Sequence, residues 1–390
     1  MQLPRAVLYI LDAYRRFGRE AFVVGGPVRD ALLGGVPKDY DLTTDATPEE
    51  TKEIFRDCRV IETGIAHGTL TIVLDGMPYE VTTYRIDGEY TDHRHPTGVT
   101  FTRSLEEDLA RRDFTVNAMA YHPDFGIVDP FYGREDLARA SLRAVGEPHR
   151  RFREDALRIL RGLRFAAVLG FTIEEKTAAA MRALAVHLSS VSVERVLVEV
   201  RKLLAGPSAD AVLMQYGDIL HTAIPELCFA DLPPLSLLPD TEARLVAIAA
   251  RSDLGRDGAR ALFERLHTDR ALRTLSDDVF LALDMPRETD LDLLYIARRI
   301  GYAHAAVALA VGDFCRGEAS DAPMRLAALE TRGIPTQVGD LAIGGRDVVA
   351  MGVRGARVGE LLDTLLDLVL RGECDNRREA LLLRLSHLVP

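Results

Sequence analysis

Residues 23–44 read VVGGPVRDALLGGVPKDYDLTT, and this stretch decides the expected class of fold. A short apolar run, typical of a strand, ends at Gly25 and Gly26, and a helix is predicted from Pro27. Paired glycines let a backbone approach a phosphate chain closely, and a helix start offers unpaired N–H groups to an anion. Arg29 adds a permanent positive charge with a planar fork of donors, so the stretch indicates a phosphate-binding turn.

Two carboxylates follow this turn, Asp39 and Asp41, with one residue between them. In an extended strand, residues i and i+2 project to the same face, so we expect both carboxylates to point together. Like charges that close repel unless a cation lies between them, and Mg²⁺ prefers oxygen ligands, with water and phosphate completing its shell. The segment therefore predicts a nucleoside triphosphate site with Asp39 and Asp41 as Mg²⁺ ligands. A glycine turn or a surface strand alone would be commonplace, and it is their combination at this spacing that favours the site.

The composition is that of an ordinary globular chain, and its charge does not favour nucleic acid. The chain has 390 residues, is 47% hydrophobic and carries a formal net charge of −11. No apolar run reaches the roughly 18 residues of a membrane helix, so no membrane partner is expected. An RNA partner would need a local basic patch, and residues 139–164 contain eight arginines. Zinc and disulfide frameworks are disfavoured, and the cytoplasm favoured, because the cysteines stand far apart, at Cys58, Cys228, Cys315 and Cys374.

Strand and helix signals divide the chain near residue 154. The first third contains the extended runs AFVVGG and YDLTTD, and two β-branched runs around Asp75 and Gly76 predict a hairpin. A further segment, DFTVNAMAY, is typical of a strand or of a passage from strand to helix. Thr47 and Pro48 mark a helix start. From about Glu154 onward apolar residues recur at helical spacing, so we expect an α+β head followed by a long helical body.

Glu80 lies in YEVTTYR, the second run of the predicted hairpin. A strand carboxylate beside the aspartate pair would be a third catalytic member of the site, supporting the metal or accepting the proton of a 3′-hydroxyl. A solvent-facing strand glutamate explains the residue equally well.

Four motifs together resemble the tRNA nucleotidyltransferase and poly(A) polymerase family of the polymerase-β superfamily, nearest to its bacterial-type (class II) CCA-adding enzymes: GGPVRD, DYD, RRDFTVNAMAY and REDALRILRGLRF. The resemblance covers about the first 205 residues. It implies a polymerase-β-like nucleotidyltransferase head with a mixed β-sheet at 1–140, a helical neck that selects the base at 141–206, a helical body at 207–300 and a helical, tRNA-binding tail at 301–390. It also implies Mg²⁺-dependent addition of CCA, from CTP and ATP, to the tRNA 3′ end.

The third motif places Arg112, Asp113 and Asn117 near a strand end. Asp113 and Asn117 can exchange hydrogen bonds with ribose hydroxyls, and Arg112 can meet a phosphate. In the resembling family this motif contacts the sugar and the phosphates. A charged helix cap is the alternative.

The fourth motif contains EDALR, which we expect on one helix, with Asp155 and Arg158 adjacent on its surface. Cytosine and adenine present an amino donor beside an unprotonated ring nitrogen, whereas guanine and uracil present a carbonyl beside a ring N–H. A carboxylate next to a guanidinium complements the first pattern and opposes the second, so the pair would admit CTP and ATP and reject GTP and UTP. Glu154 is expected to hold Arg158 in place. An ordinary surface ion pair, worth little, is the alternative.

Arg161 and Arg164 are expected on the same side of that helix, with leucines 157, 160 and 163 on the other. By the family's pattern these two arginines also belong to the nucleotide site. In the later segment SVERVLVEVRKLL, Glu194 and Arg195 are interpreted as structural.

The polar segment 85–98 bears on which family member this is. It has the composition of a mobile loop, and in the family a loop of this type accompanies addition of A, which argues against CC-only activity. A-only addition and polyadenylation remain alternatives, as does, more distantly, a non-catalytic RNA-binding protein on a transferase head. The sequence carries no signal that fixes an oligomeric state.

Overall fold

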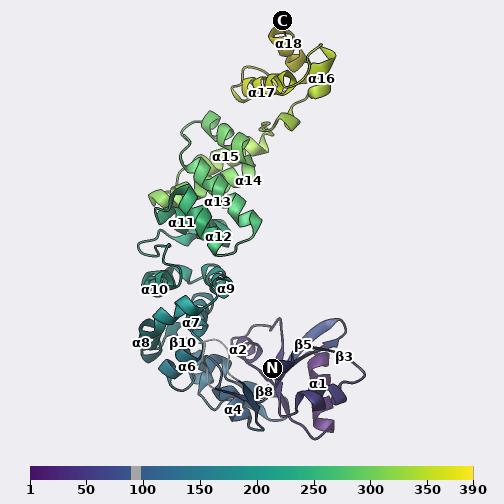
Figure 1. Ribbon diagram of the computed structural model, residues 1–390, viewed down its shortest axis with the longest axis vertical. Helices are drawn as coiled ribbons and strands as arrows, with labels where there is room; N and C mark the ends of the chain where they lie inside the picture. Colours follow the sequence, from purple (N-terminus) through teal and green to yellow (C-terminus); the bar gives the residue numbers. More distant parts are fainter. Residues whose placement is uncertain (89–97, 390) are drawn as a thin grey trace. The chain divides into compact units, whose positions relative to one another are not determined.

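The computed structural model describes residues 1–88 and 98–389, which form two compact units, Met1–Pro225 and Glu226–Pro390 (Figure 1). The first unit holds a β-sheet with helices around it. In the described residues of the second unit, the regular structure is helical throughout. None of the helices described is both long and apolar enough to cross a bilayer.

The sheet of the first unit has seven strands: β1 (Ala21–Val24), β2 (Asp41–Thr44), β3 (Arg59–Gly64), β4 (Thr69–Leu74), β5 (Met77–Thr83), β8 (Ala120–His122) and β9 (Gly126–Val128). Their order across the sheet is β3-β4-β5-β2-β1-β8-β9. The β2–β5 pair is parallel, and the other neighbours are antiparallel. The expected mixed sheet is therefore confirmed.

Strand β1 lies inside this sheet, and all four of its residues are buried. Phe22 and Val24 pack with Leu109 of helix α4 (Leu105–Ala110). Helix α1 (Arg5–Arg16) also packs against the strand. Since apolar contacts fix β1, they also fix the glycine turn that follows it.

Local signals in this unit gave the expected elements. The β4–β5 hairpin turns at Asp75 and Gly76, both left-handed with φ of 51° and 77°, as a two-residue turn between twisted strands requires. Thr47 caps helix α3 (Pro48–Ile54) in a capping box with Glu50. The segment expected as a strand or a passage to a helix forms a short 3₁₀ turn before β8.

The remaining strands form two small sheets, β6 (Arg85–Asp87) with β7 (Val99–Phe101), and β10 (Ser141–Leu142) with β11 (Thr172–Ile173). β11 is an exception to the helical structure expected after residue 154. Gly170 explains it, because its left-handed conformation (φ 70°) ends the preceding helix and returns the chain alongside β10.

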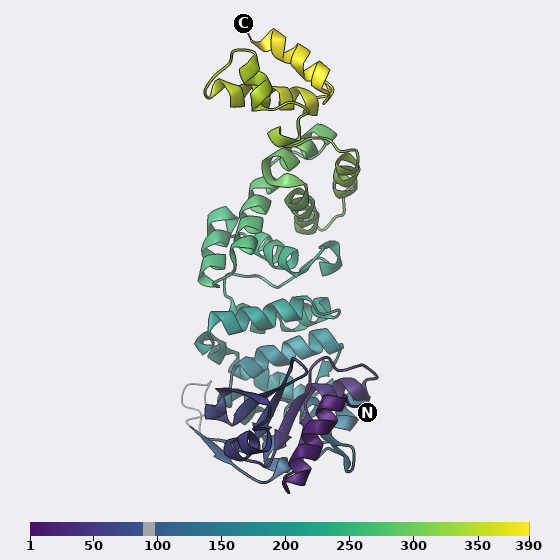
Figure 2. The ribbon, with the colours of Figure 1, turned by 90° about the vertical axis from the view of Figure 1, so that its right-hand side faces the viewer.

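The remaining helices of the first unit are α2 (Gly26–Leu32), α5 (Gly133–Ala138), α6 (Pro148–Glu154), α7 (Leu157–Leu169), α8 (Glu175–Leu184), α9 (Val193–Leu204) and α10 (Ala209–Ala223). α7 packs against both α9 and α10, and α6 packs against α8 (teal in Figure 2). The first unit thus holds residues 1–225, which include the expected head and neck and the first part of the expected body.

The second unit contains α11 (Thr241–Arg251), α12 (Gly255–Arg265), α13 (Arg270–Leu283), α14 (Asp290–Arg316), α15 (Ala322–Thr331), α16 (Gly345–Ala350), α17 (Arg357–Leu370) and α18 (Arg378–Leu388). α14 packs against α11, α13 and α15. Gly301, with φ of 79°, breaks α14 just after the expected body–tail boundary at residue 300. The division of the chain at residues 140, 206 and 300 stays a prediction.

Candidate active site

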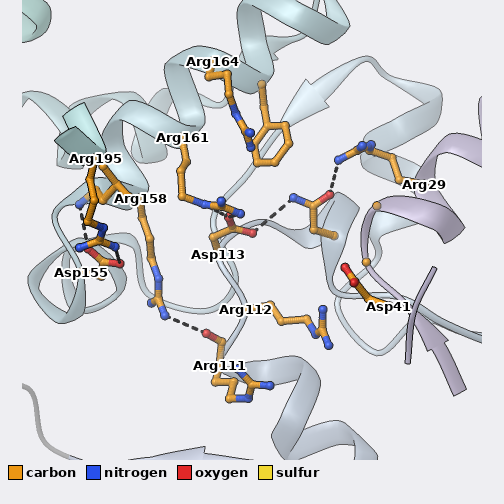
Figure 3. Close-up of a pocket in the computed structure, with 15 residues that line it drawn as sticks. Arg29, Asp41, Arg111, Arg112, Asp113, Asp155, Arg158, Arg161, Arg164 and Arg195 are labelled. Carbon is orange, nitrogen blue, oxygen red and sulfur yellow. Dashed lines mark hydrogen bonds and ion pairs between the residues drawn. The ribbon is translucent and has the colours of Figure 1, made fainter. Parts of the chain in front are cut away.

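A cavity of about 510 Å³ opens where the β1–α2 turn, the start of β2, the segment before β8 and helices α7 and α9 meet (Figure 3). Seven arginines and three aspartates line it, a formal surplus of four positive charges in a chain of net charge −11. Its size and charge suit an anionic ligand as large as a nucleotide. The lining residues are Gly25, Gly26, Arg29, Asp41, Arg111, Arg112, Asp113, Asn117, Asp155, Leu157, Arg158, Arg161, Arg164, Phe165 and Arg195.

Asp41 is the first residue of β2, and its parallel partner on β5 is Glu80. The placement of Glu80 beside the aspartate strand is therefore confirmed. Asp39, in contrast, lies in a bend before the strand, so the expectation that the two aspartates stand in one strand is wrong, although both side chains are exposed. The reason is that β1 gives way to the glycine turn at Gly25, which leaves no strand opposite Asp39. Asp39 lines an adjoining cavity of about 540 Å³, which Asp41 borders as well.

The charge of Asp41 is disfavoured where it stands. Desolvation by the surrounding protein raises the pKa of this carboxyl, Glu80 and Asp39 raise it further, and Arg112 opposes them. A cation between the carboxylates would relieve this repulsion, so Asp39 and Asp41 fit a divalent ion that takes its other ligands from phosphate and water. Among the described residues no group of three or more His, Cys, Asp or Glu side chains would hold a metal by itself.

The two glycines of the turn differ in what a side chain would meet. Gly25 has φ of 76°, and a Cβ there would lie 3.1 Å from Nη1 of Arg112. A Cβ on Gly26 would make only an ordinary contact, 3.6 Å from Nη2 of Arg29. Arg29 is buried, and its Nη1 donates to Oδ1 of Asn117 at 2.6 Å. The turn is thus tied to the segment before β8, and the missing side chain of Gly26 keeps the cavity open.

Asp113 lines the cavity and accepts hydrogen bonds from three neighbouring residues. Its Oδ1 accepts from the backbone N–H of Phe114 (2.9 Å) and from Nδ2 of Asn117 (3.3 Å). Its Oδ2 accepts from Nε of Arg161 (2.8 Å). Burial alone would raise the pKa of Asp113, but the charge and hydrogen bond of Arg161 lower it to about 2. Asp113 is therefore an anion that orients Arg161 and Asn117, and its own contact with a ribose stays a prediction.

Arg112 extends toward Asp41 across the cavity (Figure 3). Its Nη2 lies 3.4 Å from Oδ2 of Asp108 on α4, a buried carboxylate. This ion pair holds the guanidinium of Arg112 at the cavity wall near Asp41, where a phosphate is expected.

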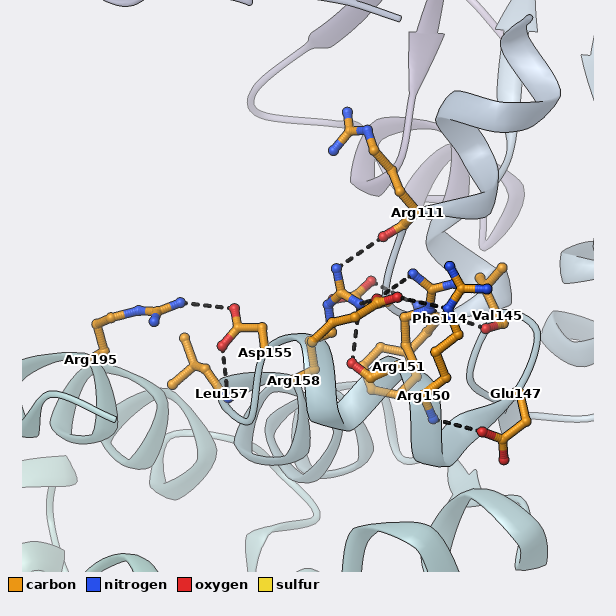
Figure 4. A network of polar contacts seen from close by, with 12 residues as sticks. Arg111, Phe114, Val145, Glu147, Arg150, Arg151, Asp155, Leu157, Arg158 and Arg195 are labelled. Carbon is orange, nitrogen blue, oxygen red and sulfur yellow. Dashed lines mark hydrogen bonds and ion pairs between the residues drawn. The ribbon is translucent and has the colours of Figure 1, made fainter. Parts of the chain in front are cut away.

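The EDALR segment does not form the continuous helix expected from the sequence (Figure 4). α6 ends at Glu154, Asp155 is extended (φ −141°, ψ 107°), and α7 begins at Leu157. The expectation that Asp155 and Arg158 stand one turn apart on the same helix is therefore wrong. Asp155 Oδ1 accepts from the backbone N–H of Leu157 (3.0 Å), and Oδ2 accepts from Nη2 of Arg195 (3.0 Å).

Arg158 is held by other partners. Its Nη1 donates to Oε2 of Glu154 (2.7 Å), which confirms that Glu154 holds this arginine, and to the carbonyl of Arg151 (3.2 Å). Its Nη2 donates to the carbonyl of Arg111 (3.0 Å), which anchors the helix to the head. Both Asp155 and Arg158 nevertheless line the same cavity.

Arg161 and Arg164 lie on the cavity side of α7, as expected. The guanidinium of Arg164 stands 4.1 Å from the ring centroid of Phe165, and its Nε lies 3.0 Å from Oε2 of Glu199. Leu157 lines the cavity with them, contrary to the expected apolar side. Of the eight arginines in residues 139–164, only three line this cavity, Arg158, Arg161 and Arg164.

Four lining residues were missed by the sequence interpretation: Arg111, Leu157, Phe165 and Arg195. Arg111 and Phe165 each adjoin a predicted residue, so extending the motifs by one position would have found them. Arg195, interpreted as structural, reaches Asp155 from forty residues away, and no local pattern indicates that contact. Most of the predicted loop at 85–98 lies outside the described residues, which resume at residue 98 after residue 88.

Two family models match the chain, the poly A polymerase head domain over residues 21–143 and the probable RNA- and SrmB-binding site of polymerase A over residues 170–230. A CCA-adding enzyme of Lacticaseibacillus paracasei is 38% identical over 97% of this chain and 95% of its own length. One of Geobacillus kaustophilus is 37% identical over 95% and 94%. The crystal structure of the Bacillus stearothermophilus CCA-adding enzyme in complex with CTP superposes with a TM-score of 0.82 at 33% identity, covering 100% of this chain and 98% of that one.

Proposed function

The chain belongs to the family of CCA-adding enzymes, and we propose that it adds C, C and A, from CTP and ATP, to the 3′ end of tRNA without a nucleic-acid template. One observation carries the proposal: a single arginine-rich cavity joins the carboxylate of Asp41 to the Asp155 and Arg158 side chains. A nucleotide spanning that cavity would have its phosphates at one end and its base at the other. The CTP bound by the solved relative supports a nucleotide as the ligand.

Nucleotidyltransferases generally use a divalent metal ion, and we assign Mg²⁺ to Asp39 and Asp41. The raised pKa of Asp41 and its proximity to Asp39 fit such an ion. When bound, the ion would supply positive charge for activating the attacking hydroxyl and for neutralising the departing pyrophosphate. Glu80, beside Asp41, is the third carboxylate of the site and acts through Asp41 or on the 3′-hydroxyl.

The residues of this chain bind and orient the reactants. The transfer joins a tRNA 3′-oxygen to the α-phosphorus and breaks the bond between that phosphorus and the oxygen bridging to the β-phosphate, which releases pyrophosphate. The proton of the 3′-hydroxyl passes to Glu80 or to solvent water. Gly26 leaves space for the phosphates, and Arg112 and Arg161 neutralise them. Asp113 holds Arg161 and Asn117 in place for the phosphates and the ribose.

Base selection is assigned to Asp155 and Arg158. The base's amino group would donate to the Asp155 carboxylate, whose oxygens keep further lone pairs beyond their two protein hydrogen bonds. Within the described residues, hydrogen bonds use three of the five N–H donors of Arg158, so two remain for a ring nitrogen. A uracil or guanine edge would set a carbonyl against the carboxylate, at a cost of about 1–3 kcal/mol.

The test is incubation of the protein with tRNA lacking its 3′ CCA and with labelled CTP, ATP or both. We expect products extended by CC with CTP alone and by CCA with both nucleotides. Products with a single A would indicate an A-only enzyme, and long A tracts a poly(A) polymerase. No incorporation by the wild-type protein would contradict the proposal and favour a non-catalytic RNA-binding protein.

Asp41→Asn is the matched control. We expect it to lose at least about 10³-fold in kcat, because the charge that holds the cation is gone. Its thermal midpoint should equal or exceed that of the wild type, since the repelled carboxylate is removed. Retained activity in this variant would show that the label is incorporated at another site.

Two further assignments concern the binding of the acceptor tRNA and the cell compartment. We place tRNA binding on the helices of residues 207–300 and 301–390, which would recognise RNA by shape and backbone. The four cysteines are free among the described residues, which supports a reducing cytoplasm.

A further inference from the structure

Arg195 is held at the base-selecting end of the cavity. It comes from the first turn of α9, a helix that packs against α7. Its Nη2 donates to Oδ2 of Asp155 at 3.0 Å, and both side chains line the cavity, Arg195 28% and Asp155 17% exposed (Figures 3 and 4). The pair therefore lies at the cavity surface, where a ligand could contact it.

An arginine at position 195 does not stabilise helix α9. The first turn of a helix carries partial positive charge, so a cation there is unfavourable and an acidic residue favourable. In addition, Nη1 of Arg195 is buried without a hydrogen-bond partner among the described residues, which costs free energy. The hydrogen bond described for this guanidinium goes to Asp155. Since neither its position in the helix nor its Nη1 stabilises the fold, we attribute the presence of Arg195 at the cavity wall to its contact with Asp155.

The two side chains assigned to base selection have separate anchors. Glu154 and two backbone carbonyls hold Arg158, whereas the Leu157 N–H and Arg195 hold Asp155. Two donors, one on each oxygen, fix the rotation of the Asp155 carboxylate. Without Arg195, one oxygen would be free to turn, and the acceptor would no longer face one defined direction.

We propose that Arg195 is a specificity-determining positioning residue, which fixes the Asp155 carboxylate where it accepts a hydrogen bond from the amino group of cytosine or adenine. The inference rests on the proposed function. Loss of Arg195 weakens the correct contact and also relaxes the repulsion of a uracil or guanine carbonyl. Both effects lower the discrimination between CTP or ATP and UTP or GTP.

The experiment compares Arg195→Met and Arg195→Lys with the wild type, using full-length protein and tRNA lacking CCA. The readout is kcat/KM for CTP and ATP divided by kcat/KM for UTP and GTP. We expect Arg195→Met to lower this ratio roughly tenfold, and Arg195→Lys, which keeps a charge near Asp155, to restore most of it. The control is Lys202→Met, an exposed residue of the same helix, which should keep the wild-type ratio.

A double variant separates positioning from a merely structural role. If Arg195 acts through Asp155, adding Arg195→Met to Asp155→Asn should change the ratio less than twofold beyond Asp155→Asn alone. An equal loss of kcat/KM for all four nucleotides, or an unchanged ratio in Arg195→Met, would overturn the inference. Should Arg195→Met not fold, Arg195→Gln takes its place, because its shorter, uncharged side chain cannot form the ion pair with Asp155; an unchanged ratio in Arg195→Gln would likewise overturn the inference. Failure of the proposed function is a different result, since then the wild-type protein itself would incorporate neither CTP nor ATP.

Discussion

Gly25 and Gly26 are adjacent, yet different physical demands make each of them glycine. Gly25 has a left-handed backbone and stands against the Arg112 guanidinium. Gly26 has an ordinary helical backbone and room for a methyl group, which would project toward Arg29 at the cavity wall. Conformation thus requires the first glycine, and the phosphate expected in the cavity requires the second.

We expect the two Gly→Ala variants to separate stability from binding. Gly25→Ala should lower the free energy of unfolding by about 1–2 kcal/mol, because alanine disfavours positive φ. Gly26→Ala should keep wild-type stability and raise the KM for CTP, since its methyl group narrows the cavity. Urea unfolding and steady-state kinetics of both variants measure this. Equal loss of stability in both variants would contradict the distinction.

Asp113 predicts a pH dependence of stability. Its pKa is about 2 in the folded protein, against an ordinary value of 3.8, because Arg161 outweighs the effect of burial. A lowered carboxyl pKa stabilises the fold above the unfolded-state value, and this stabilisation, on the order of 2 kcal/mol, is lost as pH falls from about 4 to 2. Asp113→Asn should therefore be less stable than the wild type at pH 7, with the difference shrinking below pH 4. A difference that stays constant with pH in urea titrations would argue against the ion pair as its source.

At the scale of elements, the break between α6 and α7 is what places the base-selecting groups. A continuous helix would have set Asp155 and Arg158 side by side on one surface. The extended residue at 155 instead turns its carboxylate to the start of α7 and to α9. The helix contacts α7–α9 and α7–α10 then decide where the cavity wall stands.

Gly206 tests that packing. It follows the end of α9 and allows a close approach, because a Cβ there would lie 2.6 Å from the backbone C and O atoms of Ala167 on α7. Gly206→Ala should lower the free energy of unfolding by about 2 kcal/mol or more and weaken nucleotide selection, since the backbone of α7 must move. Gly359→Ala is the control: it lies within α17 with nothing within 4 Å, and should raise stability by about 0.5–1 kcal/mol. Calorimetry of both variants measures the effect, and a neutral Gly206→Ala would refute the packing argument.

At the scale of the whole molecule, charge is divided unevenly. The chain has net charge −11, while the residues lining the cavity carry a formal surplus of four positive charges. A small triphosphate held among partly buried arginines is screened less by salt than a long RNA held at exposed surfaces. The two substrates should therefore respond differently to ionic strength.

We expect the KM for tRNA to rise on the order of tenfold between about 50 and 200 mM KCl, while the KM for CTP rises less than about threefold. Steady-state kinetics at several salt concentrations, with chloride replaced by acetate as a control for specific anion effects, would measure both. Equal salt dependence for the two substrates would contradict the division between buried and exposed sites.

The sequence alone predicted what neighbouring residues encode. The glycine turn after β1, the turn at Asp75 and Gly76 and the cap at Thr47 depend on backbone preference, which acts over a few residues. The mixed sheet was expected only from the resemblance to the family. The sequence also indicated the chemistry, because carboxylates, arginines and paired glycines at short spacing have few other uses.

Only the tertiary structure decided which of these groups meet. Asp155 pairs with Arg195 rather than with Arg158, and Asp39 lies outside the strand that Asp41 begins. Both outcomes depend on partners distant in the chain: α9 for the first, and the end of β1 for the second. Local spacing limits where a side chain can point. A contact, however, needs both of its partners in place, and only the packing of the helices brings residues forty positions apart within hydrogen-bonding distance.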